Sequence, residues 1–300
     1  MRTPGTSALT TEHGELSADA YDFLRRLVYE HSRINLGNDK MELVRSRVRK
    51  RLRALGLPDF ESYCRLLESA DGEQELTALL DVISTNVTEF FREFDHFDFL
   101  QTAVLPLLTA SPRRGDEEPL LFWSAACSSG QEPYSLAVLL ADYFSREPGR
   151  RAWQIAATDI STRMLDIARQ GIYRSEQVKL PRPEWLRAFF QKGTGKWEGQ
   201  CRIKASLRER VTFEHLNLFD WPYPWQHQFH VIFCRNVMIY FDRSTQEELV
   251  SHLAAQLRPG GYLFVGHSES LIGLGHGLKS LRPSVYTKTK AGNEYAAVIH

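Results

Sequence analysis

Polar side chains follow three apolar runs of the sequence, at the points where strands are expected to end. The run 120–125 leads into a turn of small residues, Asp159 closes the next run, and Arg235 with Asn236 follows a third. Because the carboxyl ends of parallel strands meet at one edge of a sheet, we expect these segments to line one pocket. The sequence therefore predicts a ligand site at this edge.

The turn of small residues at 124–130 indicates which ligand the pocket would take. It contains one glycine, Gly130, where a dinucleotide fingerprint has three, so a phosphate-binding loop is disfavoured. Asp159 is placed to accept hydrogen bonds from a ribose diol, but it could equally cap the helix that follows Ser161 or lie in a surface turn. A nucleoside without phosphates is the better ligand, and S-adenosyl-L-methionine is the common one.

Apolar runs rich in β-forming residues alternate with helical patterns after Pro112, which is typical of a parallel α/β sheet. Seven strands fit a doubly wound, Rossmann-like sheet of the α/β class with an antiparallel edge strand. We predict them at 120–125, 154–158, 211–215, 230–234, 262–266, 284–288 and 295–299.

The chain divides into segments of different character. Residues 1–15 hold few large apolar groups and predict a flexible tail. Helical periodicity over 16–85 predicts an all-helical N-terminal domain, and 86–300 form the α/β domain. The stretch from about 171 to 210 is longer than one crossover helix needs and contains a glycine-rich hairpin pattern, so we predict a small inserted β-subdomain there.

The composition restricts the class of protein. The chain has 300 residues and a formal net charge of zero, so an acidic partner would have to be attracted by a local patch. No apolar run reaches the length of a membrane helix, and we expect a cytoplasmic protein that does not insert into the membrane. The four cysteines and ten histidines have no zinc-ligand spacing, and we expect no metal.

Six segments, together with the helical region before them, resemble the CheR-type chemotaxis receptor methyltransferases. They stand in the family's order, and the resemblance covers about residues 20–290. It implies an S-adenosyl-L-methionine-dependent protein-glutamate O-methyltransferase with S-adenosyl-L-homocysteine as product. The segments are NVTEFFRE at 86–93, FWSAACSSGQEPYSLA at 122–137, ATDIS at 157–161, LNLFD at 216–220, FCRNVMIYFD at 233–242 and GGYLFVGHSESL at 260–271.

The resemblance also implies which residues serve the site. Arg92 and Tyr240 would lie at the reaction centre. Apart from the resemblance, Arg92 could be a surface helix residue, Asn217 the cap of a turn and Leu218 a core residue. The residues that would hold the methyl donor are Asn86, Thr88, Arg92, Glu132, Asp159, Asn217, Leu218, Arg235 and Asn236.

A glutamate acceptor decides what chemistry the site requires. Its side chain has an unperturbed pKa of about 4.3, so at neutral pH it is already a nucleophile and needs no general base. The matching segments accordingly offer Arg92, Thr88, Tyr240 and amides rather than a catalytic histidine or cysteine. We expect Arg92 to position the carboxylate. Tyr240 would orient the carboxylate or wall off the methyl group, or it is simply a core aromatic.

The second predicted helix carries six cations between Arg45 and Arg53. They are compatible with a solvated helix face. The resemblance instead implies docking to the glutamate-bearing cytoplasmic helices of methyl-accepting chemoreceptors, through Arg45, Arg49 and Arg53. Nucleic acid is not expected, because no aromatic residues are interleaved there and the net charge is zero. The hairpin at 193–204 could hold a receptor tail peptide or could brace the fold.

Three interpretations of the function stay open on the sequence alone. The first is a chemoreceptor glutamate methyltransferase, which we expect to be a monomer. The second is a related methyltransferase that serves a non-chemotaxis signalling array. The third is a catalytically idle module that only binds S-adenosyl-L-methionine or receptors, and the intact Arg92, Asp159 and Tyr240 argue against it.

Overall fold

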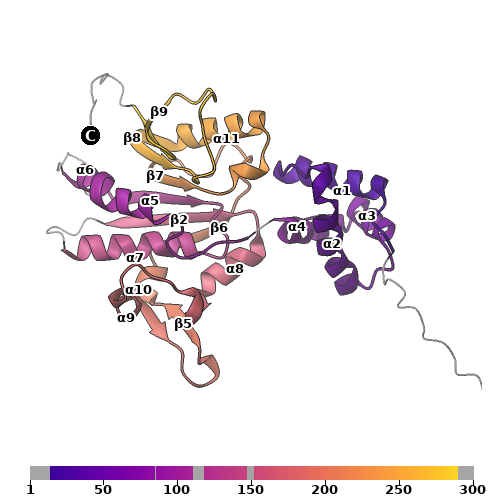
Figure 1. Ribbon diagram of the computed structural model, residues 1–300, viewed down its shortest axis with the longest axis horizontal. Helices are drawn as coiled ribbons and strands as arrows, with labels where there is room; N and C mark the ends of the chain where they lie inside the picture. Colours follow the sequence, from indigo (N-terminus) through magenta and orange to yellow (C-terminus); the bar gives the residue numbers. More distant parts are fainter. Residues whose placement is uncertain (1–13, 85, 111–117, 147–151, 290–300) are drawn as a thin grey trace, which may run out of the picture. The chain divides into compact units, whose positions relative to one another are not determined.

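The computed structural model describes residues 14–84, 86–110, 118–146 and 152–289. Contacts within the chain divide it into two units, Met1–Thr85 and Asn86–His300 (Figure 1). No helix among the described residues is long and apolar enough to cross a membrane. The predicted tail, 1–15, lies outside the described residues except for Gly14 and Glu15.

Within the described residues, the regular elements of the smaller unit are all helices, and several of their ends follow cap signals in the sequence. Its elements are α1 (Ala18–Ser32), η1 (Asn38–Lys40), α2 (Met41–Leu55), α3 (Phe60–Glu68) and α4 (Gly72–Ile83). Ser17 and Asp59 cap α1 and α3 by accepting hydrogen bonds from backbone amides at 3.2 and 2.8 Å. Gly56 ends α2 at a φ of 66°, a left-handed conformation that glycine adopts without strain.

The larger unit is built on a seven-stranded sheet (Figure 1). Its strands are β1 (Leu120–Ala125), β2 (Trp153–Asp159), β6 (Val211–His215), β7 (Phe229–Cys234), β8 (Leu257–Phe264), β9 (Leu278–Arg282) and β10 (Val285–Lys288). Their order is β6-β2-β1-β7-β8-β10-β9. The first five pair in parallel, and β10 pairs antiparallel with both β8 and β9. The direction of winding reverses between β1 and β7, and ligands bind at such a switch point, outside the carboxyl ends of the strands.

Helices connect the strands and precede β1. They are α5 (Phe94–Phe99), η2 (Leu100–Val104), α6 (Leu105–Thr109), α7 (Gln131–Arg146), α8 (Thr162–Gln170) and α11 (Arg243–Gln256). The connections through α7 and α8 run along the sheet in one direction, and the connection through α11 runs in the other. Since crossovers between parallel strands are right-handed, α7 and α8 cover one face of the sheet and α11 covers the opposite face.

A second, three-stranded antiparallel sheet is inserted between α8 and β6. Its elements are β3 (Ile172–Arg174), η3 (Ser175–Gln177), α9 (Glu184–Phe189), β4 (Phe190–Lys192), η4 (Gly195–Trp197), β5 (Gln200–Ile203) and α10 (Ala205–Arg208). Gly193 follows β4 where a Cβ atom would lie 2.1 Å from the carbonyl oxygen of Trp197, so the hairpin requires glycine. Phe90 packs on Tyr173 of β3 with ring centroids 5.0 Å apart, so the insert braces the segment before α5.

The fold predicted from the sequence is confirmed, with its helical N-terminal part, its antiparallel sheet edge and its small inserted sheet. The edge strand β9 is not among the strands predicted from the sequence. Its side chains are mostly exposed and give no apolar run. The strand predicted at 295–299 lies outside the described residues.

Candidate active site

The turn between β1 and α7 brings backbone amides to the carboxyl edge of the sheet. Positive φ values recur along it, among them 49° at Ser128 and 93° at Gly130. A side chain has no room at Gly130, because a Cβ atom would lie 2.8 Å from that of Ala168. The amide of Cys127 donates to the carbonyl of Thr158 at 2.8 Å, which joins the turn to the end of β2.

Asp159 ends β2 and is only 6% exposed. Its carboxylate accepts hydrogen bonds from the amides of Ser128 at 2.7 Å and Ser161 at 2.8 Å. The cap of α8 is Ser161, whose hydroxyl accepts from the amide of Met164 at 3.2 Å, so the interpretation of Asp159 as the helix cap is wrong. The Asp159 carboxylate holds the turn at the edge where a ribose diol binds in sheets of this kind.

Arg235 is the centre of a buried charge network at the end of β7. Its side chain is 1% exposed, and it lies 2.9 Å from Glu93 and 3.3 Å from Glu132 between the closest nitrogen and oxygen atoms. The hydroxyl of Ser124 donates to Glu132 at 2.7 Å. Two carboxyl groups therefore share one guanidinium. Loss of this cation would leave both buried carboxyl groups without an opposite charge nearby.

The pKa values of the two carboxyl groups shift in opposite directions. Desolvation raises the pKa of Glu132, and the nearby Arg235 only partly opposes this effect. Desolvation also acts to raise the pKa of Glu93, but Arg235, the side chain of Asn236 and the amide of His267 together outweigh it, so this pKa is lowered. Glu93 is therefore the member of the pair that the site keeps ionised.

Asn236 is fixed by two carboxylates. Its side-chain amide donates to Glu93 at 3.1 Å, and its backbone amide donates to Glu269 at 2.8 Å. The buried Glu269 also accepts from the amides of Gly266 at 2.6 Å and Met238 at 2.7 Å. This one carboxylate thus ties the loop after β7 to the loop after β8.

Arg92 is held between two residues of unusual backbone conformation. Phe91 and Glu93 both have a φ of 54°, which bulky or charged residues adopt only where their surroundings hold them. The ring of Phe91 stacks on Trp185 with centroids 5.2 Å apart. The guanidinium of Arg92 is itself only partly buried and donates to the carbonyl of Val87 at 3.0 Å. Its neighbours are anchored, while its own guanidinium is partly exposed to solvent.

The remaining predicted residues lie at the ends of other elements. The carbonyl of Asn86 accepts from the hydroxyl of Ser128 at 3.4 Å. The side chain of Asn217 accepts from the amide of Phe219 at 3.2 Å, so it does cap a turn. Leu218 is 7% exposed, as expected of a core residue. Both residues follow β6 at the carboxyl edge of the sheet.

The structure brings the predicted residues together in two connected groups. One joins Asn86 to Asp159 through the turn after β1. The other joins Glu132, Arg235 and Asn236 through a shared carboxylate. Both groups stand at the carboxyl ends of β1, β2 and β7, where the winding of the sheet reverses.

Thr88 and Tyr240 are not connected to either group. Both are partly buried, and Tyr240 ends a short 3-10 helix, η5 (Met238–Tyr240). Within the described residues, no hydrogen bond or ion pair joins their side chains to the two groups. Their placement therefore agrees with the segments that carry the resemblance, but the geometry adds no separate support for their roles.

Glu93 and Glu269 organise the site, although neither is among the site residues predicted from the sequence. Both stand in segments that carry the family resemblance, the first at the end of NVTEFFRE and the second in GGYLFVGHSESL. Position inside a matching segment was the only signal available, because their partners are distant in the sequence. Glu93 is separated from Arg235 by 142 residues.

The cysteines near the site do not suit nucleophilic chemistry. Burial raises the pKa values of Cys127 and Cys234 well above the usual range, so these thiols stay protonated at neutral pH. All four cysteines of the chain are free, and Cys64 is only partly buried. A thiolate attack on a substrate is therefore disfavoured at this edge of the sheet.

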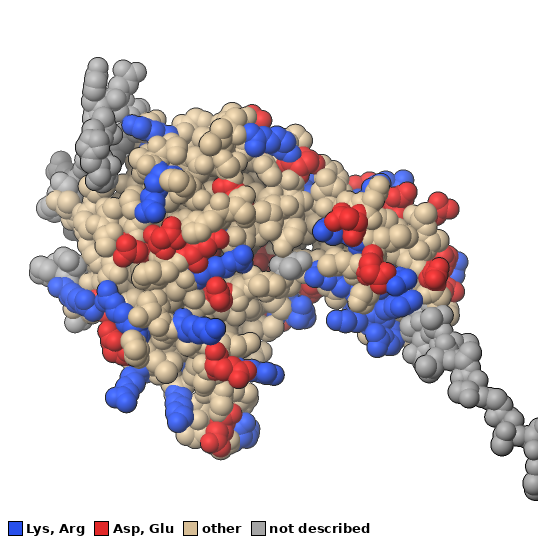
Figure 2. All heavy atoms as spheres, viewed as in Figure 1, with Lys and Arg blue, Asp and Glu red and all other residues tan. Residues whose placement is uncertain are grey.

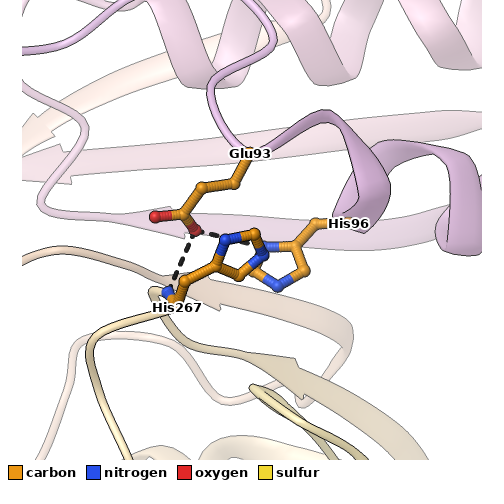
Figure 3. Close-up of side chains that lie close together, drawn as sticks. All are labelled: Glu93, His96 and His267. Carbon is orange, nitrogen blue, oxygen red and sulfur yellow. Dashed lines mark hydrogen bonds and ion pairs between the residues drawn. The ribbon is translucent and has the colours of Figure 1, made fainter.

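Glu93 also lies beside two histidines (Figure 3). Its Oε2 atom is 3.5 Å from Nδ1 of His96 and accepts a hydrogen bond from the backbone amide of His267 at 3.2 Å. The potential ligand atoms of the three side chains lie within 4.8 Å of one another. The expectation of no metal rested on spacing in the sequence, which does not connect these residues.

The cations of α2 serve different purposes. Arg51 makes two hydrogen bonds to the buried Glu75, at 2.8 and 2.6 Å, and the hydroxyl of Tyr63 donates to the same carboxylate at 2.6 Å. Arg47 donates to the carbonyls of Ile83 and Ser84 at the end of α4. These two cations stabilise the helical unit and are not available as a docking surface.

Arg45, Arg49 and Arg53 recur every four residues beside the buried stripe of α2. Arg45 pairs with Glu42 at 2.5 Å on the same helix, and Arg49 donates to the carbonyl of Gly14 at 2.9 Å. Figure 2 shows basic side chains gathered along one edge of the helical unit, with acidic side chains next to them on the same unit. A basic surface around these three arginines is compatible with docking to an acidic partner.

Comparison with known proteins gives the same assignment for both units. Residues 86–286 match the family model of the CheR methyltransferase S-adenosyl-L-methionine-binding domain, and residues 19–84 match that of the CheR methyltransferase all-alpha domain. The chemotaxis protein methyltransferase of Escherichia coli is 41% identical over 93% of this chain and 94% of its own length. Those of Salmonella typhimurium and Borreliella burgdorferi are 40% and 38% identical, over 93% and 91% of this chain and 93% and 95% of their own lengths.

The fold and the site define a methyltransferase that uses S-adenosyl-L-methionine. The chain belongs to the CheR methyltransferase family, the methyltransferases of bacterial chemotaxis. The class of enzyme and the cofactor that the sequence predicts are thereby confirmed.

Proposed function

We propose that this chain transfers methyl groups from S-adenosyl-L-methionine to glutamate side chains on the cytoplasmic helices of chemoreceptors, with S-adenosyl-L-homocysteine as the second product. The observation that carries the proposal is likeness over both units to chemotaxis protein methyltransferases, at 41% identity across 93% of the chain. A receptor helix on the cytoplasmic side would require the enzyme to act in the cytoplasm. We expect it to act as a monomer.

The residues present fit a nucleoside with a charged amino-acid tail. In this proposal the Asp159 carboxylate binds the ribose diol, and the turn that it holds leaves room for the nucleoside beside the backbone. The buried Nε of Arg235 has no hydrogen-bond partner among the described residues, which suits a polar ligand or water nearby. The residues that we propose to line the pocket are Asn86, Thr88, Arg92, Glu132, Asp159, Asn217, Leu218, Arg235 and Asn236.

The roles within this set differ. Glu132 and Arg235 contact each other, and Arg235 also pairs with Glu93, so we assign them mainly to shaping the wall of the pocket and holding Glu93 in place. Asn236 is held by Glu93 and Glu269, and its position is fixed before a ligand binds. Leu218 would supply apolar contact for the adenine ring. Pre-formed groups of this kind bind a ligand without the entropy loss of ordering them.

Esterification needs no proton acceptor from the enzyme. The bound cofactor supplies a methyl group on a sulfonium, and an ionised glutamate oxygen forms the new O–C bond as the C–S bond breaks. The chain's groups agree with this requirement: the nearby thiols are protonated, and His96 is fully buried, with a pKa that desolvation lowers to about 4. The acceptor has to bring its own negative charge, and a carboxylate does so at neutral pH.

Arg92 and Tyr240 are the residues that we place at the acceptor. Arg92 would orient the incoming carboxylate through its guanidinium, and Tyr240 would orient it further or confine the methyl group. Too strong an ion pair would stabilise the charged ground state, because charge is neutralised as oxygen meets the sulfonium. Positioning is therefore the role that we assign to Arg92.

The variant Arg92→Ala tests this role. Its rate of methyl transfer should fall about 100-fold or more, while the dissociation constant for S-adenosyl-L-homocysteine, measured by calorimetry, should rise much less. Arg92→Lys should recover part of the rate because it keeps the charge. Unchanged turnover in Arg92→Ala would remove the positioning role, and equal losses in rate and affinity would make the residue a cofactor ligand only.

Receptor docking is proposed for Arg45, Arg49 and Arg53. The support is their spacing on one side of α2. Two other cations of that helix, Arg47 and Arg51, make hydrogen bonds within the helical unit instead. Acidic receptor helices would complement this surface, and their affinity should fall with salt. A solvated surface without a partner would show no such dependence in the KM for the acceptor.

A methylation assay separates the proposed function from its alternatives. The purified chain is incubated with labelled S-adenosyl-L-methionine and receptor cytoplasmic fragments. We expect label that mild base releases as methanol, which is diagnostic of a carboxyl ester. Base-stable label would point to another acceptor atom. Cofactor binding without transfer would support an idle module, and transfer only to proteins of another signalling array would support the second alternative.

A further inference from the structure

We propose that Glu93, His96 and His267 bind one divalent first-row transition-metal ion, and that this ion weakens binding of the methyl donor. The site itself stands on the geometry of the three side chains. Its effect on the donor rests on the proposed function of Arg235 and Asn236. The ion would therefore be a regulator of the enzyme and would take no part in the transfer of the methyl group.

The three side chains converge from two separate parts of the chain (Figure 3). Glu93 and His96 stand at the start of α5, and His267 stands in the loop after β8. Their potential ligand atoms lie within 4.8 Å of one another, so rotations of the side chains would bring all three to about 2.0–2.2 Å from one ion. Two imidazoles and a carboxylate are a donor set that zinc and similar metals take, with water in the fourth position.

His96 gives independent support for a ligand at this place. Its side chain is 0% exposed, and neither ring nitrogen has a hydrogen-bond partner among the described residues. Its Nδ1 points to Glu93 at 3.5 Å, too far for a good hydrogen bond. Buried polar atoms normally have partners, and a metal ion would give one of these ring nitrogens the partner that it lacks.

His267 supplies access and a supporting contact. Its side chain is 50% exposed, so an ion could enter from solvent. Its Nε2 lies 3.0 Å from Asp95, which leaves Nδ1 as the nitrogen for a metal. A carboxylate on the second nitrogen is the usual arrangement around metal-bound histidines, where it fixes the tautomer and strengthens the ligand.

Glu93 connects the metal site to the proposed cofactor pocket. The same carboxylate holds Arg235 at 2.9 Å and Asn236 at 3.1 Å. A bound cation would draw electron density and one oxygen of Glu93 toward the imidazoles and loosen both contacts. Since coupling between two binding sites is reciprocal, a metal that weakens donor binding must itself be bound less tightly when the donor is present.

The site is tested by zinc titration of the full chain, free of an affinity tag and stripped of metal. A competing fluorescent chelator reports the dissociation constant. We expect one tight zinc per wild-type chain and at least about tenfold weaker binding in His267→Ala. His31→Ala is the matched control, because His31 is an exposed histidine on α1, and it should bind zinc like the wild type. Equal affinities of the wild type and His267→Ala would overturn the site.

X-ray absorption of the zinc-loaded wild type gives a second test that needs no variant. We expect nitrogen and oxygen neighbours at about 2.0–2.1 Å with the scattering pattern of two imidazoles. Sulfur neighbours at about 2.3 Å would place the ion on a cysteine and overturn the proposal.

The effect on the donor is measured separately, with S-adenosyl-L-homocysteine as the probe. Its dissociation constant should rise about threefold or more when zinc occupies the wild type, and zinc should leave His267→Ala unaffected. An unchanged constant in the zinc-loaded wild type would overturn the coupling. Failure of the metal-free wild type to bind S-adenosyl-L-homocysteine would instead refute the proposed function, and the zinc titration would still decide the metal site.

Discussion

Arg235→Met tests whether one buried cation holds the site together. Methionine keeps much of the apolar stem of the side chain but removes the guanidinium, so Glu93 and Glu132 lose their common partner. The arginine side chain is 1% exposed and each glutamate side chain is 14% exposed, so solvent screens the network little. Removing one partner of a buried ion pair costs about 3–5 kcal/mol. We expect a loss of this size in the free energy of unfolding at pH 7.

The assay is urea unfolding of the whole chain, followed by tryptophan fluorescence. Arg174→Met is the control, because Arg174 and its partner Glu176 are 74% and 76% exposed at a distance of 3.7 Å, and it should change stability by less than about 0.5 kcal/mol. Addition of Glu93→Gln to Arg235→Met should cost less than the two single changes summed, because both charges are then absent. A loss below about 1 kcal/mol, or strict additivity, would refute the network as the support of the site.

The loss should shrink as the pH falls from 7 toward 4. The folded-state pKa of Glu93 is lowered, so its contribution is present above the unfolded pKa and is lost as the pH falls through the folded pKa. The pKa of Glu132 is raised, so ionising it in the folded state costs stability, and protonation removes that cost. Without Arg235 both groups ionise less readily in the folded protein, and acid should favour the variant relative to the wild type. A difference that does not change with pH would contradict this account.

Three further predictions concern the reaction. Asp159→Asn should weaken S-adenosyl-L-homocysteine about 10- to 100-fold in calorimetry, because hydrogen bonds to a charged acceptor contribute about 1.5–3 kcal/mol; unchanged affinity would remove Asp159 from the ribose site. The kcat/KM of methyl transfer should rise with the ionisation of the acceptor glutamate and stay level above pH of about 6, and a second limb near neutrality would reveal an enzyme base. Arg53→Glu should raise the KM for a receptor fragment and flatten its salt dependence, without changing the affinity for S-adenosyl-L-homocysteine; an unchanged KM would make that face of α2 a solvated surface.

The sequence predicts those site residues whose position follows from the residues next to them in the chain. Asp159 follows an apolar run and precedes a helix, so its place at a strand end can be predicted without knowing its neighbours. Glu93 has no such local pattern. Its partner Arg235 is 142 residues away, and only the folded sheet brings the two together. The cluster of Glu93 with His96 and His267 could not be predicted for the same reason. The spacing of these three residues along the sequence is not that of metal ligands.

Two features could not be predicted because they depend on which side chains are exposed: the edge strand β9 and the free face of α2. The strand β9 carries mostly exposed side chains, so hydrophobic periodicity does not distinguish it from a loop. The cations of α2 look alike in the sequence, yet Arg51 is committed to the buried Glu75 and Arg53 is exposed. What separates them is the angular position of each around the helix relative to α3 and α4, and packing, rather than composition, decides which face is available.

The distribution of charge in the site follows from the chemistry of the acceptor. An enzyme that has to generate its nucleophile keeps a titratable base within reach of substrate, near the pH at which it works. Here the carboxylates accept hydrogen bonds from backbone amides or pair with Arg235, and His96 is fully buried. The carboxylates hold three loops at the carboxyl edge, and neither they nor His96 are placed to exchange protons with a substrate. A substrate that arrives already ionised requires only such an arrangement, in which the enzyme's charges fix positions and the acceptor supplies the reactivity.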